Sequence, residues 1–104
     1  MEWWEAKEIM ADGVFIGCGY FKNDGSMVEK LPADLKSRIL QYMKEPEPIL
    51  VGDDRMVDPV TGKWYGSTNL IRMKDGFIWS TPAIYMLEHY DVKLSEEFLK
   101  LFTS

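Results

Sequence analysis

The residues that could support nucleophilic chemistry are few in this chain of 104 residues, which contains one histidine, His89, and one cysteine, Cys18. A serine or cysteine nucleophile needs an adjacent base that is oriented by a third group. His89 has Glu88 beside it but lies among aromatic residues, where a lone histidine is usually a residue of the core edge or surface. Cys18 is flanked by glycines in an apolar run and has no activating neighbour in sequence. We therefore predict no catalytic residues, and a protein that is not an enzyme.

Metal and nucleotide sites also lack their usual spacing. One histidine and one cysteine cannot supply the paired ligands of a zinc site. The acids Asp53, Asp54 and Asp58 lack the glycine and terminal glutamate of a calcium-binding EF-hand loop. Residues 17–19, Gly-Cys-Gly, do not continue into the dinucleotide-binding fingerprint. We predict no metal and no cofactor.

A stretch in the middle of the chain, residues 52–66, combines acidic and aromatic residues. The members of interest are Asp53, Asp54, Asp58, Trp64 and Tyr65. Aromatic rings supply anchors at protein interfaces, and neighbouring acids steer and orient a basic partner. The stretch is therefore a candidate surface for a protein partner, although the two rings could instead cover an edge of the core.

Three further possibilities come from other residues. Trp3 and Trp4 are adjacent, so both cannot point into the core, and Trp4 is a second candidate contact with a partner. Alternatively, Trp79, Tyr85 and Tyr90 could line a pocket for a small ligand between a helix and the sheet. An enzyme whose two carboxylates meet only in the folded chain is the third possibility.

The charge balance bears on partners and location. Twelve basic and 17 acidic residues give a net charge of -5, which argues against nucleic acid as a partner and favours a basic one. No apolar run approaches the roughly 18 residues that a membrane helix needs. The acidic beginning of the chain does not resemble an export signal, and a single cysteine suits a reducing compartment. We expect a soluble, cytoplasmic protein with no membrane partner.

The elements that would position these residues begin with a short helix. Trp3, Ala6 and Met10 recur with helical spacing, and the helix would end at Gly13. The alternative is a strand over residues 8–11 followed by a hairpin turn at residues 12–13. An apolar run then predicts a strand from Val14 to Phe21.

The middle of the chain predicts a helix, a strand and a hairpin. An apolar stripe after Pro32 predicts a helix from Ala33 to Met43, and residues 49–52 predict a short strand. Residues 53–67 form the longest stretch without a regular pattern. Asp75-Gly76 lies between two β-prone segments and predicts a hairpin from Asn69 to Ser80.

Two helices complete the chain. Thr81 is the expected cap of a helix from Pro82 to His89, and Ser95 is the expected cap of a helix from Ser95 to Phe102. We expect Leu94, Phe98, Leu101 and Phe102 to line one side of the last helix.

The carboxy-terminal half resembles a segment found in small acidic bacterial proteins. It has an Asp-Gly turn, an aromatic strand ending in Trp79, and a helix with tyrosines. It ends with the pattern formed by Tyr90, Val92, Leu94, Ser95, Glu97 and Phe98. The "DPVTG" of residues 58–62 is similar to a turn in the same proteins. Such proteins are associated with immunity or accessory roles in bacterial toxin systems, so the resemblance implies a binding role without catalytic residues.

Together these observations predict one α+β domain spanning residues 1–104. A small, mainly antiparallel sheet of about four strands would be packed largely on one face by three to four helices. The predicted function is a non-catalytic protein-binding module, of the kind that inhibits a basic toxin or enzyme by occluding it.

Overall fold

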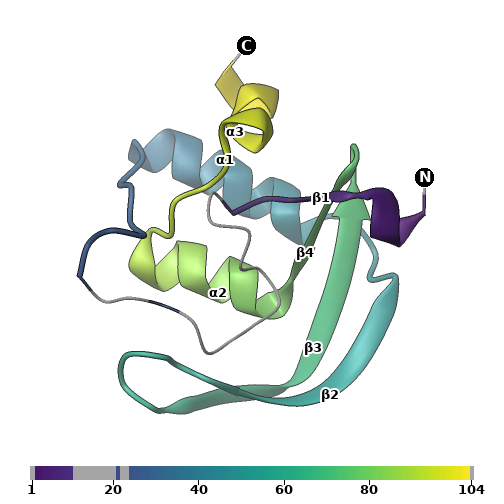
Figure 1. Ribbon diagram of the computed structural model, residues 1–104, viewed down its shortest axis with the longest axis vertical. Coiled ribbons are helices and arrows are strands. Elements are labelled where there is room, and N and C mark those ends of the chain that lie inside the picture. The colour runs from purple at the N-terminus through teal and green to yellow at the C-terminus, as the bar shows by residue number, and fades with distance from the viewer. Residues whose placement is uncertain (1, 11–20, 22–23, 104) are drawn as a thin grey trace.

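The computed structural model describes residues 2–10, 21 and 24–103 (Figure 1). In this part of the chain the fold is α+β, with a four-stranded mixed sheet of order β1-β4-β3-β2 and three α-helices. Only β1 and β4 are parallel. The elements are η1 (Trp3–Glu5, a 3-10 helix), β1 (Lys7–Glu8), α1 (Ala33–Lys44), β2 (Leu50–Val57), β3 (Trp64–Lys74), β4 (Phe77–Ser80), α2 (Thr81–Tyr90) and α3 (Glu96–Thr103).

The amino-terminal segment departs from the predicted helix, and that prediction is wrong. A single 3-10 turn is followed by β1, which begins where the Lys7 N–H donates to the Gly76 carbonyl at 2.8 Å. The extended chain then buries Ile9 completely and Met10 almost completely. Tertiary packing has overridden a helical pattern here. The alternative turn at residues 12–13, and the strand predicted to begin at Val14, lie outside the described residues.

The stretch predicted to be irregular, residues 53–67, is mostly strand. β2 runs on to Val57, and β3 begins at Trp64, so only residues 58–63 connect the two strands. The register shifts between Asp53 and Met56 and again between Met56 and Val57. Such bulges break the alternation of polar and apolar residues, which is why the strand pattern is not evident in the sequence.

The hairpin predicted from Asn69 to Ser80 is confirmed by the pairing of β3 with β4. Asp75 and Gly76 both have positive φ, 54° and 84°, as a two-residue turn of the primed type requires. β4 leads directly into α2, whose cap is Ser80 instead of the predicted Thr81. The Thr81 hydroxyl instead accepts the Leu70 N–H at 3.0 Å, which joins the beginning of α2 to β3.

The other two helices agree with prediction in their positions. α1 buries Ile39 and Met43, as its apolar stripe predicts. Ser95 caps α3, because its hydroxyl accepts the Phe98 N–H at 3.3 Å. Leu101 does not line the buried side of α3, since 43% of it is exposed.

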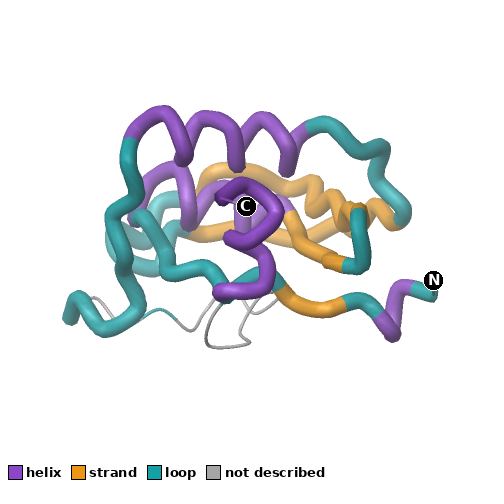
Figure 2. The backbone as a smooth tube through the Cα atoms, turned by 90° about the horizontal axis from the view of Figure 1, so that it is seen from above, coloured by secondary structure: helices purple, strands orange, loops and turns teal. Residues whose placement is uncertain are grey.

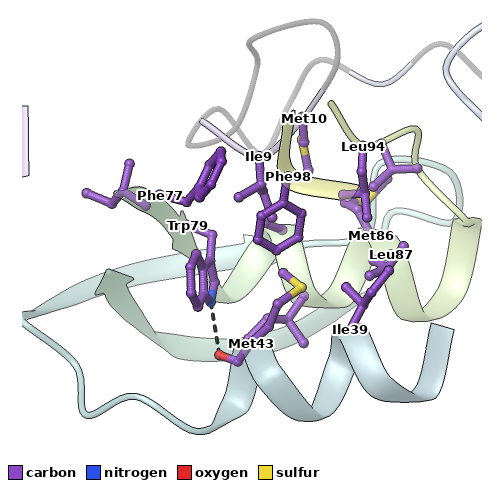
Figure 3. Close-up of a cluster of buried hydrophobic side chains, with 14 residues drawn as sticks. Ile9, Met10, Ile39, Met43, Phe77, Trp79, Met86, Leu87, Leu94 and Phe98 are labelled. Carbon is purple, nitrogen blue, oxygen red and sulfur yellow. Dashed lines mark hydrogen bonds between the residues drawn. The ribbon is translucent and has the colours of Figure 1, made fainter. Parts of the chain in front are cut away.

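The core forms where β4 and the three helices α1, α2 and α3 meet (Figure 3). All four residues of β4 are buried, so both faces of the sheet are covered at this strand. Trp79 is fully enclosed, and its indole N–H donates to the Met43 carbonyl at 2.9 Å near the end of α1. The Phe98 ring lies 5.2 Å from the ring of Phe77 and 6.1 Å from that of Trp79. These rings connect α3 to the sheet.

The connected end of the β2–β3 hairpin lies far from α3 along the long axis of the molecule. α3 lies at one end of the axis and the hairpin connection at the other (Figure 1), and in the view from above α3 is in front while the amino terminus lies at one side (Figure 2). The connection between β2 and β3 therefore lies away from α3, whereas the other end of β3 pairs with β4 beside Trp79.

Replacing Trp79 with phenylalanine tests the core. The variant loses the bond to the Met43 carbonyl and leaves space around a smaller ring, so we expect the free energy of unfolding to fall by about 2 kcal/mol. Urea denaturation measures this value. The matched control, Trp3→Phe at a half-exposed position, should change it by less than about 0.5 kcal/mol. Equal effects of the two substitutions would contradict the assignment.

Candidate functional site

The connection between β2 and β3 is a turn organised around Asp58. Its carboxylate Oδ1 accepts the backbone N–H groups of Val60 at 2.8 Å and Thr61 at 2.9 Å. Its carbonyl oxygen accepts the Gly62 N–H at 2.8 Å, and Gly62 has a φ of 74° that favours glycine. The Asp58 N–H donates in turn to the Lys63 carbonyl at 2.8 Å. The turn therefore has a defined shape of its own.

The same carboxylate fastens this turn to α2. The Tyr85 hydroxyl donates to Oδ2 of Asp58 at 2.5 Å, and the Tyr90 hydroxyl lies 2.6 Å from the same oxygen. Asp58 is only 4% exposed. The Tyr65 ring, near the beginning of β3, stacks on the Tyr85 ring with the centroids 3.7 Å apart and the planes 5° from parallel. Two polar contacts and one ring contact thus hold the hairpin against the helix.

The protonation states of this cluster follow from its contacts. Burial alone would raise the pKa of Asp58, but the bonds from Tyr85, Tyr90 and two backbone N–H groups outweigh it and hold the pKa well below the ordinary 3.8. The bond to Asp58, followed by burial, raises the pKa of Tyr85 to about 12 and also raises the pKa of Tyr90. The carboxylate therefore stays ionised, and the two phenols stay protonated, near neutral pH.

The buried position of Asp58 corrects one part of the predicted partner surface. Asp58 lies inside the molecule with its carboxylate engaged, so it does not offer a charge to a partner. Tyr65 is half-buried against Tyr85. It therefore fits the alternative interpretation, in which its ring covers an edge of the core. Both residues support the hairpin from within.

The other predicted residues of this stretch come together on the surface of the hairpin. Trp64 is 60% exposed, and Asp53 and Asp54 are also exposed. An open hollow of about 500 Å³ lies between them and is lined by Asp53, Asp54, Arg55, Trp64 and Ser67. The structure thus gathers two carboxylates and an indole around one hollow, with a guanidinium that the sequence did not single out.

A second hollow continues along the same strand. Its volume is about 430 Å³, and its lining residues are Leu50, Val51, Gly52, Asp53, Asp54, Asn69 and Ile71. Leu50 is 51% exposed and Val51 is 69% exposed. The two hollows share Asp53 and Asp54, and we call them together the β2 groove. The sequence placed residues 49–52 in a strand but gave no sign that the strand would lie open to solvent.

The remaining predicted site residues lie apart from the β2 groove. Trp4 is 66% exposed, but it precedes β1, which is at the opposite edge of the sheet from β2. The alternative pocket is not assembled as predicted. Trp79 is fully enclosed and bonded to α1, whereas Tyr85 and Tyr90 bind Asp58 of the hairpin.

The described residues form neither a metal-binding cluster nor a membrane-spanning helix. Among residues 2–10, 21 and 24–103, no three His, Cys, Asp or Glu side chains are grouped so that they could hold a metal ion. Within the same residues, no helix combines the length and apolar character needed to cross a bilayer.

Removing the Asp58 side chain tests its role as an anchor. Asp58→Ala leaves two tyrosine hydroxyls and two backbone N–H groups without their acceptor, so we expect the free energy of unfolding to fall by about 3 kcal/mol. The matched control, Asp54→Ala at an exposed site, should change it by less than about 0.5 kcal/mol. Denaturant titration measures both values. Equal losses of unfolding free energy in the two variants would contradict the role of Asp58 as an anchor.

The depressed pKa of Asp58 also predicts a pH dependence. As the pH falls, the unfolded chain binds the Asp58 proton before the folded protein does. The stability that this carboxylate contributes is therefore fully present above about pH 5 and is lost as the pH falls below about 4. The difference in free energy of unfolding between the wild type and Asp58→Asn should be largest near about pH 6 and shrink towards about pH 3. Parallel pH curves for the two proteins would contradict this assignment.

Comparisons of the chain with models of protein families, with curated proteins and with solved structures gave no match.

Proposed function

We propose that this protein is a non-catalytic binding module that grips a basic protein through the β2 groove. In this proposal it acts as an immunity-type inhibitor, which covers a functional surface of a toxin or enzyme. The single observation that carries the proposal is the exposed indole of Trp64 beside the carboxylates of Asp53 and Asp54.

The energetics of such a surface favour protein recognition. A tryptophan that is mostly exposed in the free protein can bury a large apolar area in a complex, and tryptophan is among the residues most often dominant in binding energy. Leu50 and Val51 add exposed apolar area at the other end of the β2 groove. The two carboxylates fix which partner charge is accepted, since an acidic partner would meet like charges.

The overall charge supports the same partner class. With a net charge of -5, the molecule attracts a basic protein over distances of about 10 Å at ordinary salt concentrations. Long-range attraction of this kind raises the association rate, which suits an inhibitor that must capture its target quickly.

The function is tested with the double variant Trp64→Ala/Asp54→Ala. The immobilised wild type is used to recover basic proteins from a bacterial lysate, and each recovered protein is purified and titrated calorimetrically. We expect the double variant to bind the partner at least about tenfold more weakly, because it lacks the ring and one of the two carboxylates. Its thermal midpoint should stay within about 4 °C of the wild type.

The matched control removes one ring and one acid elsewhere. Trp4→Ala/Glu29→Ala changes the same number of rings and charges at exposed positions away from the β2 groove, and it should keep wild-type affinity. Wild-type affinity in the Trp64→Ala/Asp54→Ala variant would exclude the groove as the binding surface. A loss of affinity only in the Trp4→Ala/Glu29→Ala variant would assign the binding surface to the opposite edge of the sheet.

A further inference from the structure

We infer that the β2 groove receives an extended, basic segment of the partner, which pairs with the outer edge of β2 as an added strand. This inference rests on the proposed function and goes further, because it specifies the conformation and the chemistry of the segment that is bound.

The first observation is an open strand edge. In the sheet order β1-β4-β3-β2, β2 is the last strand, and in the described part of the chain no strand pairs with its outer side. Six consecutive residues, Leu50 to Arg55, are exposed. An edge strand carries a row of backbone donors and acceptors that a second extended chain can satisfy.

The second observation is the order of side chains along that edge. Leu50 and Val51, with Ile71 across the strand pair, form an apolar end of the groove. Asp53 and Asp54 lie at its middle, and Trp64 at its other end. An extended chain places successive side chains on its two faces, so a segment with apolar residues at its ends and basic residues in its middle presents both kinds, on either face, in the order of these contacts.

The regular pairing of β2 limits the length of the added strand. Leu50 to Asp53 keep an even register with β3, and the bulge begins beyond Asp53. Four residues of strand span about 13 Å at about 3.3 Å per residue. A segment of about six to eight residues would cover this edge and reach Trp64.

The charges select a basic segment over a second copy of this chain. Two β2 strands that paired edge to edge in antiparallel fashion would bring Asp53 and Asp54 of one copy near the same residues of the other. Like charges opposite each other destabilise a strand pair. Arg55 and its counterpart could offset only part of this repulsion, and each copy carries a net charge of -5. A segment with lysine or arginine meets the two carboxylates without that cost.

The test uses synthetic octapeptides with blocked ends. The parent peptide has two valines at each end and four lysines between them, and a second peptide replaces every lysine with glutamate. A third peptide keeps the parent side chains but carries N-methyl groups on four consecutive residues, which removes backbone donors from both edges. Affinity is measured by calorimetry. Amide hydrogen exchange of residues 50–55 reports whether the backbone edge is engaged.

We expect the parent peptide to bind and to slow exchange on β2. The glutamate peptide should show no binding, and N-methylation should weaken binding at least about tenfold. Asp53→Lys/Asp54→Lys should also weaken binding of the parent at least about tenfold, while the control Asp34→Lys, at an exposed site on α1, should leave it unchanged.

Three outcomes would overturn the inference. Equal affinity for the N-methylated peptide would show that charge alone holds the segment. An absence of parent binding would exclude strand addition, and the partner titration with Trp64→Ala/Asp54→Ala would still decide the proposed function. A wild-type dimer in analytical ultracentrifugation that dissociates on Val51→Lys substitution would assign the edge to a second copy.

Discussion

The bond between the Asp58 carboxylate and the hydroxyls of Tyr85 and Tyr90 is the constraint on which the hairpin depends. A buried ionised group is costly unless its charge is compensated by hydrogen bonds. Here, donors from the turn and from α2 converge on one carboxylate, so the group that shapes the turn also attaches it to the helix. Trp64 begins the strand that leaves this turn, and its place on the surface is therefore set by a contact with the interior.

An exposed edge with apolar residues is ordinarily an aggregation hazard, and the β2 groove contains features that oppose it. The bulge after Asp53 interrupts the edge, and two adjacent carboxylates make pairing with an identical strand unfavourable. In the proposed function the same carboxylates define the complementary partner, because a basic segment avoids the repulsion that a second copy would meet. Protection against self-association and the proposed choice of partner thus depend on the same residues.

Two local signals in the sequence predicted their parts of the fold correctly. Asp75-Gly76 formed its turn and Ser95 its cap, since each depends on residues within a few positions. The failures involve distant partners. β1 exists because the Gly76 carbonyl accepts a bond from Lys7, and the role of Asp58 depends on tyrosines 27 and 32 residues away. Asp53, Asp54 and Trp64 line one hollow because they lie on paired strands, which the irregular pattern of residues 53–67 did not predict. The exposure of Leu50 and Val51 follows from the strand order, which local patterns do not reveal.

The residues that anchor the hairpin differ from those of the proposed partner surface, and this separation has an energetic consequence. The residues that hold the hairpin, Asp58 and Tyr65, contact α2, while those of the proposed partner surface are exposed on β2 and β3. A surface that is already ordered before binding loses less conformational entropy in the complex. In the proposed complex, the stability of the Asp58 cluster would contribute to affinity indirectly, by keeping the indole and carboxylates in place. A surface of this kind can change Leu50, Val51 or Trp64 to suit a new partner without altering the contacts that maintain the fold.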